Sequence, residues 1–195
     1  MQDVSYFSII IICLITSLYN NVARQNFLWI YFLAVLLFEI LHLNNVINTR
    51  MYSYSAIFYT LFFLNIYLNQ YSAVTFIRII LNIIVVSLAL FFYAIDSNSY
   101  PISIGLLMNF TYIFLGIIWL YVQFINIEYT PIIKRQFFWI TISILIWSIF
   151  FLFRLVPMYL FQNNDKTFLM TIDEIFKVMT IVSYIIFFRG LICKI

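Results

Sequence analysis

The sequence predicts an all-α, polytopic membrane protein: a seven-transmembrane-helix bundle with its N-terminus outside and its C-terminus in the cytoplasm. Of its 195 residues, 66% are hydrophobic and only 9% are charged, whereas a soluble domain averages about half apolar and a quarter charged. The apolar residues fall in runs close to the length that crosses a bilayer, about 20 residues per helix. This composition excludes a water-soluble domain. The ten Lys and Arg residues are too scattered to form the basic face that binds nucleic acid.

Seven helices are expected, because seven apolar runs alternate with short breaks rich in residues that favour turns. The expected helices span residues 4–20, 26–43, 52–69, 74–95, 101–126, 136–161 and 168–188. The first run carries Asp3 where a signal peptide carries Lys or Arg, so we expect it to remain as a membrane span. The links are too short for a second element of structure, and we expect one domain over residues 1–195.

The expected orientation follows from the loops, because positively charged loops are retained in the cytoplasm. With seven spans, one side of the membrane collects only Arg50 and Lys166. The other side collects six positive residues, namely Arg24, Arg78, Lys134, Arg135, Arg189 and Lys194. The side with six is taken as cytoplasmic, which predicts an outside N-terminus for a protein of the cytoplasmic (inner) membrane.

Six ionisable residues lie inside the expected helices, namely Glu39, His42, Arg154, Asp173, Glu174 and Lys177. Such groups cost about 2.5 to 3.5 kcal/mol each on insertion scales, so they usually face the bundle interior and find partners. Counted from the turn near Asn164, Arg154 lies at nearly the same depth as the two carboxylates of the last helix, since a helix rises 1.5 Å per residue. We expect all six in the outer half or near the midplane of the membrane, where Asn109 would join them.

The spacing of the last helix predicts which of these charges pair. Asp173 and Lys177 are four residues apart and Glu174 and Lys177 are three apart, so either carboxylate lies on a face next to the lysine. Lys177 is expected to hold one carboxylate, and Arg154 the other. Arg154 is expected to be the central member of the cluster, because it alone brings a charge from the sixth helix.

Two compatible hypotheses follow from this cluster. In the first, Arg154 and Lys177 balance Asp173 and Glu174 in a charge-neutral lock between the sixth and seventh helices. In the second, the cluster is a polar site open to the outside that binds a small ligand or ion, with Glu39 or His42 as an added titrating group. The second hypothesis predicts a non-enzymatic sensor or transport-like protein.

The sequence offers no pattern of catalytic residues. Glu39 and His42 have the Glu-x-x-His spacing of di-iron bundles, but such a site needs a second copy and the chain has a single histidine. Three glycines do not make a phosphate-binding loop, and two cysteines lack the spacing of a zinc site. We therefore expect neither an enzyme nor a metal site.

Three segments resemble a group of small, uncharacterised bacterial inner-membrane proteins with six to eight helices, often found with sensor kinases. The segments are FLAVLLFEILHL, RQFFWITISILIWSIFFLF and SYIIFFRGLICK. The group has no assigned catalytic residues. The resemblance implies a sensory or accessory role in the membrane, with a sensor kinase or a second copy of the chain as partner.

A second resemblance is local and concerns the last two helices. The segment DEIFKV, after Trp147 in the sixth helix, resembles the sixth and seventh helices of microbial rhodopsins. The resemblance implies retinal as a cofactor, bound as a Schiff base at Lys177, with Asp173 as the counterion. A third class of function, an oligomeric pore or an effector that acts on the lipid bilayer, stays open.

Overall fold

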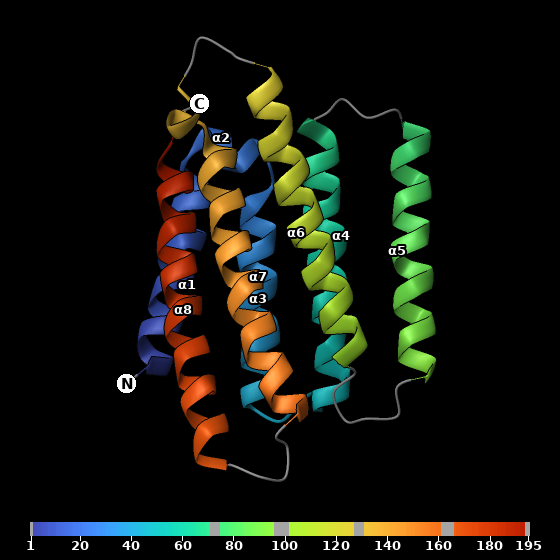
Figure 1. Cartoon of the computed structure of the whole chain (residues 1–195). Coiled ribbons are helices and arrows are strands. Elements are labelled where there is room, and N and C mark those ends of the chain that lie inside the picture. The colour runs from blue at the N-terminus through green and yellow to red at the C-terminus, as the bar shows by residue number, and fades with distance from the viewer. Residues whose placement is uncertain (1, 71–74, 96–101, 127–130, 161–165, 194–195) are drawn as a thin grey trace. The chain divides into compact units, whose positions relative to one another are not determined.

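The computed structural model describes residues 2–70, 75–95, 102–126, 131–160 and 166–193, and Figure 1 shows their helices. Every regular element within these ranges is helical, which confirms the all-α class. The elements are α1 (Gln2–Tyr19), α2 (Asn21–Gln25), α3 (Leu28–Leu43), α4 (Thr49–Gln70), α5 (Thr75–Ile95), α6 (Ile102–Ile125), the 3-10 helix η1 (Ile132–Lys134), α7 (Gln136–Leu160) and α8 (Lys166–Ile192).

Each of the seven expected ranges is occupied by one long helix, in order α1, α3, α4, α5, α6, α7 and α8. The short helix α2 was not expected, because its sequence reads as a polar turn. It forms where the side chain of Asn20 accepts hydrogen bonds from the backbone N–H groups of Val22, at 2.9 Å, and Ala23, at 3.4 Å. Phe27, with φ of 56°, then separates α2 from α3, since a residue in the left-handed conformation cannot continue a helix.

Among the residues that the structure describes, four helices are long and apolar enough to cross a membrane, over Thr75–Ile95, Ile102–Ile125, Gln136–Pro157 and Thr167–Ile192. Two more, Val4–Tyr19 and Leu28–Leu43, are apolar but shorter. Helix α4 has the length but not the hydropathy, because tyrosine, asparagine, serine and threonine recur along it. By length and composition, the chain thus has helices for several passes through a bilayer, and the number seven stays a prediction.

The chain divides into two compact units. Unit 1 comprises Met1–Trp29 and Gly116–Ile195, and unit 2 comprises Ile30–Leu115. Helix α6 contributes its second half to unit 1 and its first half to unit 2.

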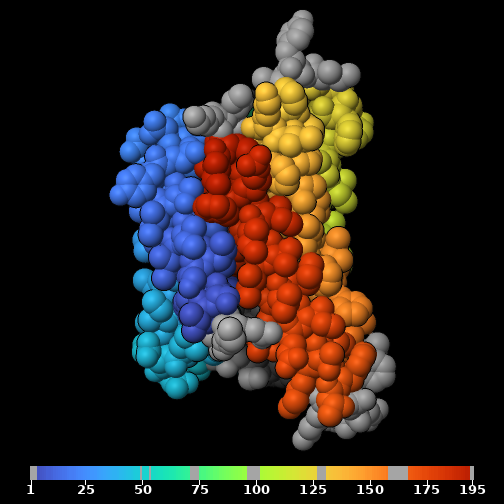
Figure 2. Space-filling model, turned by 90° about the vertical axis from the view of Figure 1, so that its left-hand side faces the viewer, coloured from blue at the N-terminus to red at the C-terminus, as the bar shows by residue number. Residues whose placement is uncertain are grey.

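Helix α8 organises unit 1 by packing along both α1 and α7. The α1 and α8 surfaces lie side by side in Figure 2. Between these helices, the ring centroids of Tyr6 and Tyr184 are 5.9 Å apart. Towards α7, the hydroxyl of Ser143 donates a hydrogen bond of 2.7 Å to the carbonyl of Ser183. Gly190 allows the closest approach, because a Cβ there would lie 3.1 Å from the backbone oxygen of Gln136.

Aromatic rings join α3, α4 and α6 within unit 2. The Tyr31 ring of α3 lies 5.5 Å from Tyr59 and 5.0 Å from Phe63 of α4. Phe63 in turn lies edge-on to Tyr112 of α6, at 5.2 Å. Such edge-to-face pairs add to the stabilisation that burial of the rings provides.

Helix α5 turns its polar groups towards α4 and its apolar groups outwards. Asn82 pairs with Asn65 of α4, and Tyr93 accepts a hydrogen bond from Arg50 through its carbonyl, at 3.2 Å. The outward side chains are large, exposed and apolar, among them Phe76, Ile79, Ile83, Leu90 and Phe91. A soluble helix has the opposite pattern, with its polar face in water, so α5 is built to face lipid.

Candidate functional site

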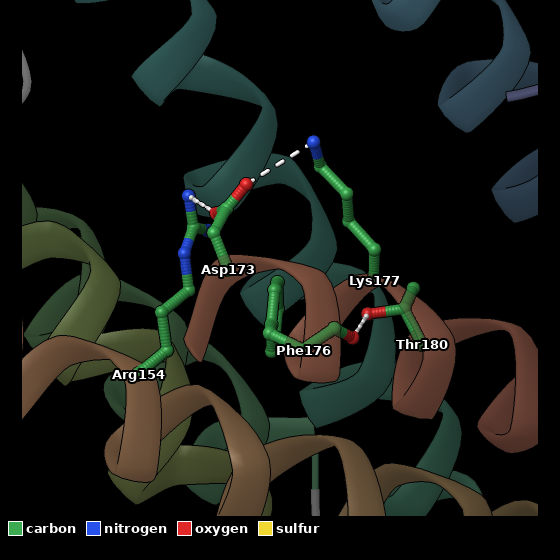
Figure 3. Close-up of polar contacts among 5 residues, drawn as sticks. All are labelled: Arg154, Asp173, Phe176, Lys177 and Thr180. Carbon is green, nitrogen blue, oxygen red and sulfur yellow. Dashed lines mark hydrogen bonds and ion pairs between the residues drawn. The ribbon is translucent and has the colours of Figure 1, made fainter. Parts of the chain in front are cut away.

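A charged cluster of three residues, Arg154, Asp173 and Lys177, links α7 to α8 in unit 1 (Figure 3). Arg154 Nη2 lies 2.7 Å from Asp173 Oδ1. Lys177 Nζ lies 3.1 Å from Asp173 Oδ2. One carboxylate therefore holds two cations, one with each oxygen.

Helix geometry and an aromatic platform position this charged cluster. Asp173 and Lys177 are four residues apart, so both side chains leave α8 on the same side. The Arg154 guanidinium lies over the ring of Phe176, 4.9 Å from its centroid. Phe151 and Trp147 of α7 pack against that ring, at 6.0 Å and 5.9 Å. The platform fixes the guanidinium by cation–π attraction and contact, and the sequence signal for it is the helical spacing of positions 147, 151 and 154.

The pairing differs from the expected one at Glu174. Lys177 and Arg154 share Asp173, whereas Glu174 is exposed and forms no ion pair with any residue that the structure describes. The reason is angular, because successive residues of a helix lie about 100° apart around its axis. Asp173 faces α7, and its neighbour therefore points elsewhere. Asp173, and not Arg154, is the central member of the cluster.

The charged cluster is open to its surroundings and carries an excess of positive charge. The side chains of Lys177, Arg154 and Asp173 are 53%, 32% and 26% exposed. Two cations and one carboxylate leave a net charge of +1, and the buried Nε of Arg154 has no hydrogen-bond partner in the described ranges. An ammonium on a flexible stem, next to a fixed guanidinium, is an arrangement that binds anionic groups.

Glu39 and His42 lie in unit 2, where both meet Tyr52. The Tyr52 hydroxyl donates a hydrogen bond of 2.8 Å to Glu39 Oε1. The His42 ring lies 4.8 Å from the Tyr52 ring, and its Nδ1 is buried without a hydrogen-bond partner. Sequence reasoning missed Tyr52 as a partner, although it follows His42 by ten residues across a short link to the next helix.

Asn109 also lies in unit 2, on α6, and it is completely buried. Within the described part of the chain, both polar atoms of its side chain lack a hydrogen-bond partner. Its expected association with the charged cluster, like that of Glu39 and His42, stays a prediction.

Among the residues that the structure describes, no group of three or more His, Cys, Asp or Glu side chains is placed to hold a metal ion. No protein-family model, no curated protein and no solved structure matches this chain. The two resemblances therefore stay predictions.

Proposed function

We propose that this chain is a seven-helix protein of the cytoplasmic membrane that binds a small anionic ligand at the charged cluster, as a sensor or a transport-like protein. One observation carries the proposal: Arg154 and Lys177 share the single carboxylate of Asp173. The unmatched positive charge is costly near a bilayer interior. An anion that contacts Lys177 offsets that cost, whereas a cation would add to it.

The depth of the charged cluster suits a ligand that arrives from water. Arg189 lies near Trp139 at the opposite end of α7 and α8, 5.9 Å from its ring centroid. Asp173 is sixteen residues from Arg189, which is about 24 Å along a helix that rises 1.5 Å per residue. The hydrocarbon core is about 30 Å thick, so an Arg189 at one boundary leaves Asp173 close to the other. With the expected orientation, that boundary is the outer one.

A ligand at this position would act on the contact between α7 and α8. Lys177 can leave Asp173 for a ligand while Arg154 keeps the two helices joined, because each cation uses a different oxygen of the carboxylate. Because both cations share one carboxylate, a change in the pair of Lys177 with Asp173 also alters the pair of Arg154 with Asp173. This coupling is what a sensor that reports to a membrane kinase requires.

Thermal unfolding with inorganic phosphate tests the proposed ligand class. In lipid nanodiscs at constant ionic strength, phosphate should raise the melting temperature of the parent, by the equivalent of about 1.4 kcal/mol at ten times the dissociation constant. Lys177→Gln should abolish this shift. Arg24→Gln, which removes an exposed cation of unit 1, should retain it. Equal shifts in the parent and in Lys177→Gln would refute anion binding at the cluster.

Cysteine labelling tests the seven spans and their orientation. Single cysteines at Asn45 and Asn164 should react with an impermeant reagent in intact cells, and a cysteine at Thr130 should react only after the membrane is opened. Labelling of Thr130 in intact cells would overturn the orientation and place the cluster on the cytoplasmic side.

A further inference from the structure

Asn109 is a buried polar residue of α6 whose side chain makes no hydrogen bond to its own helix. Its side chain is 0% exposed, and neither its amide nitrogen nor its amide oxygen has a hydrogen-bond partner among the residues that the structure describes. Buried polar groups in folded proteins almost always have partners. The missing hydrogen bonds of the Asn109 amide cost more on α6, a helix apolar enough to cross a membrane, because no bulk water reaches such a site.

Other asparagines inside helices of unit 2 satisfy themselves locally. Asn65 donates a hydrogen bond to the carbonyl of Leu61, at 2.8 Å, and Asn82 donates one to the carbonyl of Arg78, at 2.9 Å. Both bonds reach back four residues along the helix. Asn109 does not donate the equivalent hydrogen bond to the carbonyl of Gly105. Its amide is therefore directed away from its own backbone.

Thr60 of α4 lies at the same level as Asn109. Helices α4 and α6 run in the same direction (Figure 1), and the rings of Phe63 and Tyr112 contact each other at 5.2 Å. Thr60 and Asn109 each precede their ring by three residues, which is one turn of helix. The Thr60 hydroxyl is 2% exposed and donates its proton to the carbonyl of Ala56, at 2.7 Å. Its lone pairs therefore remain as acceptors.

We propose that Asn109 and Thr60 hold an internal water molecule inside unit 2. The occupant must both donate and accept hydrogen bonds, since Asn109 offers an acceptor and a donor and Thr60 offers an acceptor. It is uncharged, because α6 carries no Lys, Arg, Asp or Glu. It is small, because Met108 and Tyr112 on either side of Asn109 are both buried. Water is the molecule that meets these conditions with the usual count of about three partners.

X-ray footprinting in ¹⁸O-labelled water tests the site, because radiolysis of a bound water oxidises the side chains around it. In nanodiscs, Tyr112 should take up the ¹⁸O label severalfold faster than Tyr184, a tyrosine of unit 1 that is also buried. Thr60→Val, which replaces only the hydroxyl, should slow labelling at Met108 and Tyr112. Asn109→Leu should slow it further.

Thr111→Val is the matched control, because Thr111 makes the same four-residue back-bond on α6, to Leu107 at 2.8 Å. It should leave the labelling rates of the parent unchanged. The proposal is overturned if Tyr112 reacts no faster than Tyr184 in the parent. It is equally overturned if Met108 and Tyr112 are labelled as fast in Thr60→Val as in the parent. This variant tests the proposal even where Asn109→Leu fails to fold.

Discussion

The two units join their helices with polar groups in opposite ways. In unit 2, Asn65 and Asn82 form an amide pair, in which each side chain donates to the other at 2.9 Å and 3.0 Å. Each amide also bonds its own helix. In unit 1, the charged cluster sets two cations against one carboxylate and leaves an exposed ammonium. The amide pair is neutral and its two side chains bond each other, whereas the charged cluster has two cations for one carboxylate.

This difference separates a structural device from a candidate site. Interhelical amide bonds in membranes contribute modestly, about 0.6 kcal/mol on average and up to about 1.7 kcal/mol. They need no outside partner. An unmatched charge costs more free energy in the folded state and still attracts ions of the opposite sign. Selection for stability alone would therefore favour the neutral pair. The amide pair therefore joins α4 to α5, and the charged cluster is the candidate site for the proposed ligand.

Asp173→Asn should give the largest loss of stability, because it leaves both Arg154 and Lys177 without a carboxylate. Breaking a buried ion pair typically costs about 3 to 5 kcal/mol, and the partial exposure of this pair reduces the expected loss to about 2 to 3 kcal/mol. The measurement is thermal or denaturant unfolding in nanodiscs. Glu174→Gln, one residue away, should unfold like the parent.

A compensating change sharpens this test. Lys177→Gln in the Asp173→Asn background should recover part of the loss, because one stranded cation is removed. If Glu174→Gln proves as damaging as Asp173→Asn, Lys177 contacts Glu174 in the membrane and the comparison between the two units fails.

Asn82→Leu should have a smaller effect, a loss of about 1 kcal/mol, because it strands the amide oxygen of Asn65 at the α4–α5 contact. Replacing both residues by leucine should recover much of that loss, since exchanging both partners of a neutral hydrogen bond for apolar groups can be nearly neutral. Unfolding of the two single variants and the double variant measures the coupling. A double variant less stable than either single one would show that the amide pair does more than hold the helices.

The sequence predicts the helices well, because the length of an apolar run is a property of the chain alone. It also places Arg154 and Asp173 at one depth, since depth follows from counting residues along a helix. It does not predict which carboxylate faces α7, because that depends on rotation about the helix axis. The contact of Tyr52 with Glu39 and the amide pair depend on how two helices approach, which no single helix encodes. Helix α2 was missed for a local reason, the cap at Asn20.

The smallest expected effect is that of all-trans retinal, which should produce no visible absorption band when it is added to the purified protein. A retinal Schiff base needs a lysine enclosed against water, whereas the Lys177 side chain is 53% exposed and its ammonium is paired with Asp173 at 3.1 Å. The visible spectrum of the parent should therefore match that of Lys177→Arg, which keeps the charge and cannot form the bond. A red-shifted band in the parent that Lys177→Arg removes would make Lys177 a covalent site. Lys177 would then be the attachment site of an aldehyde, and the proposed anion would lose its principal contact.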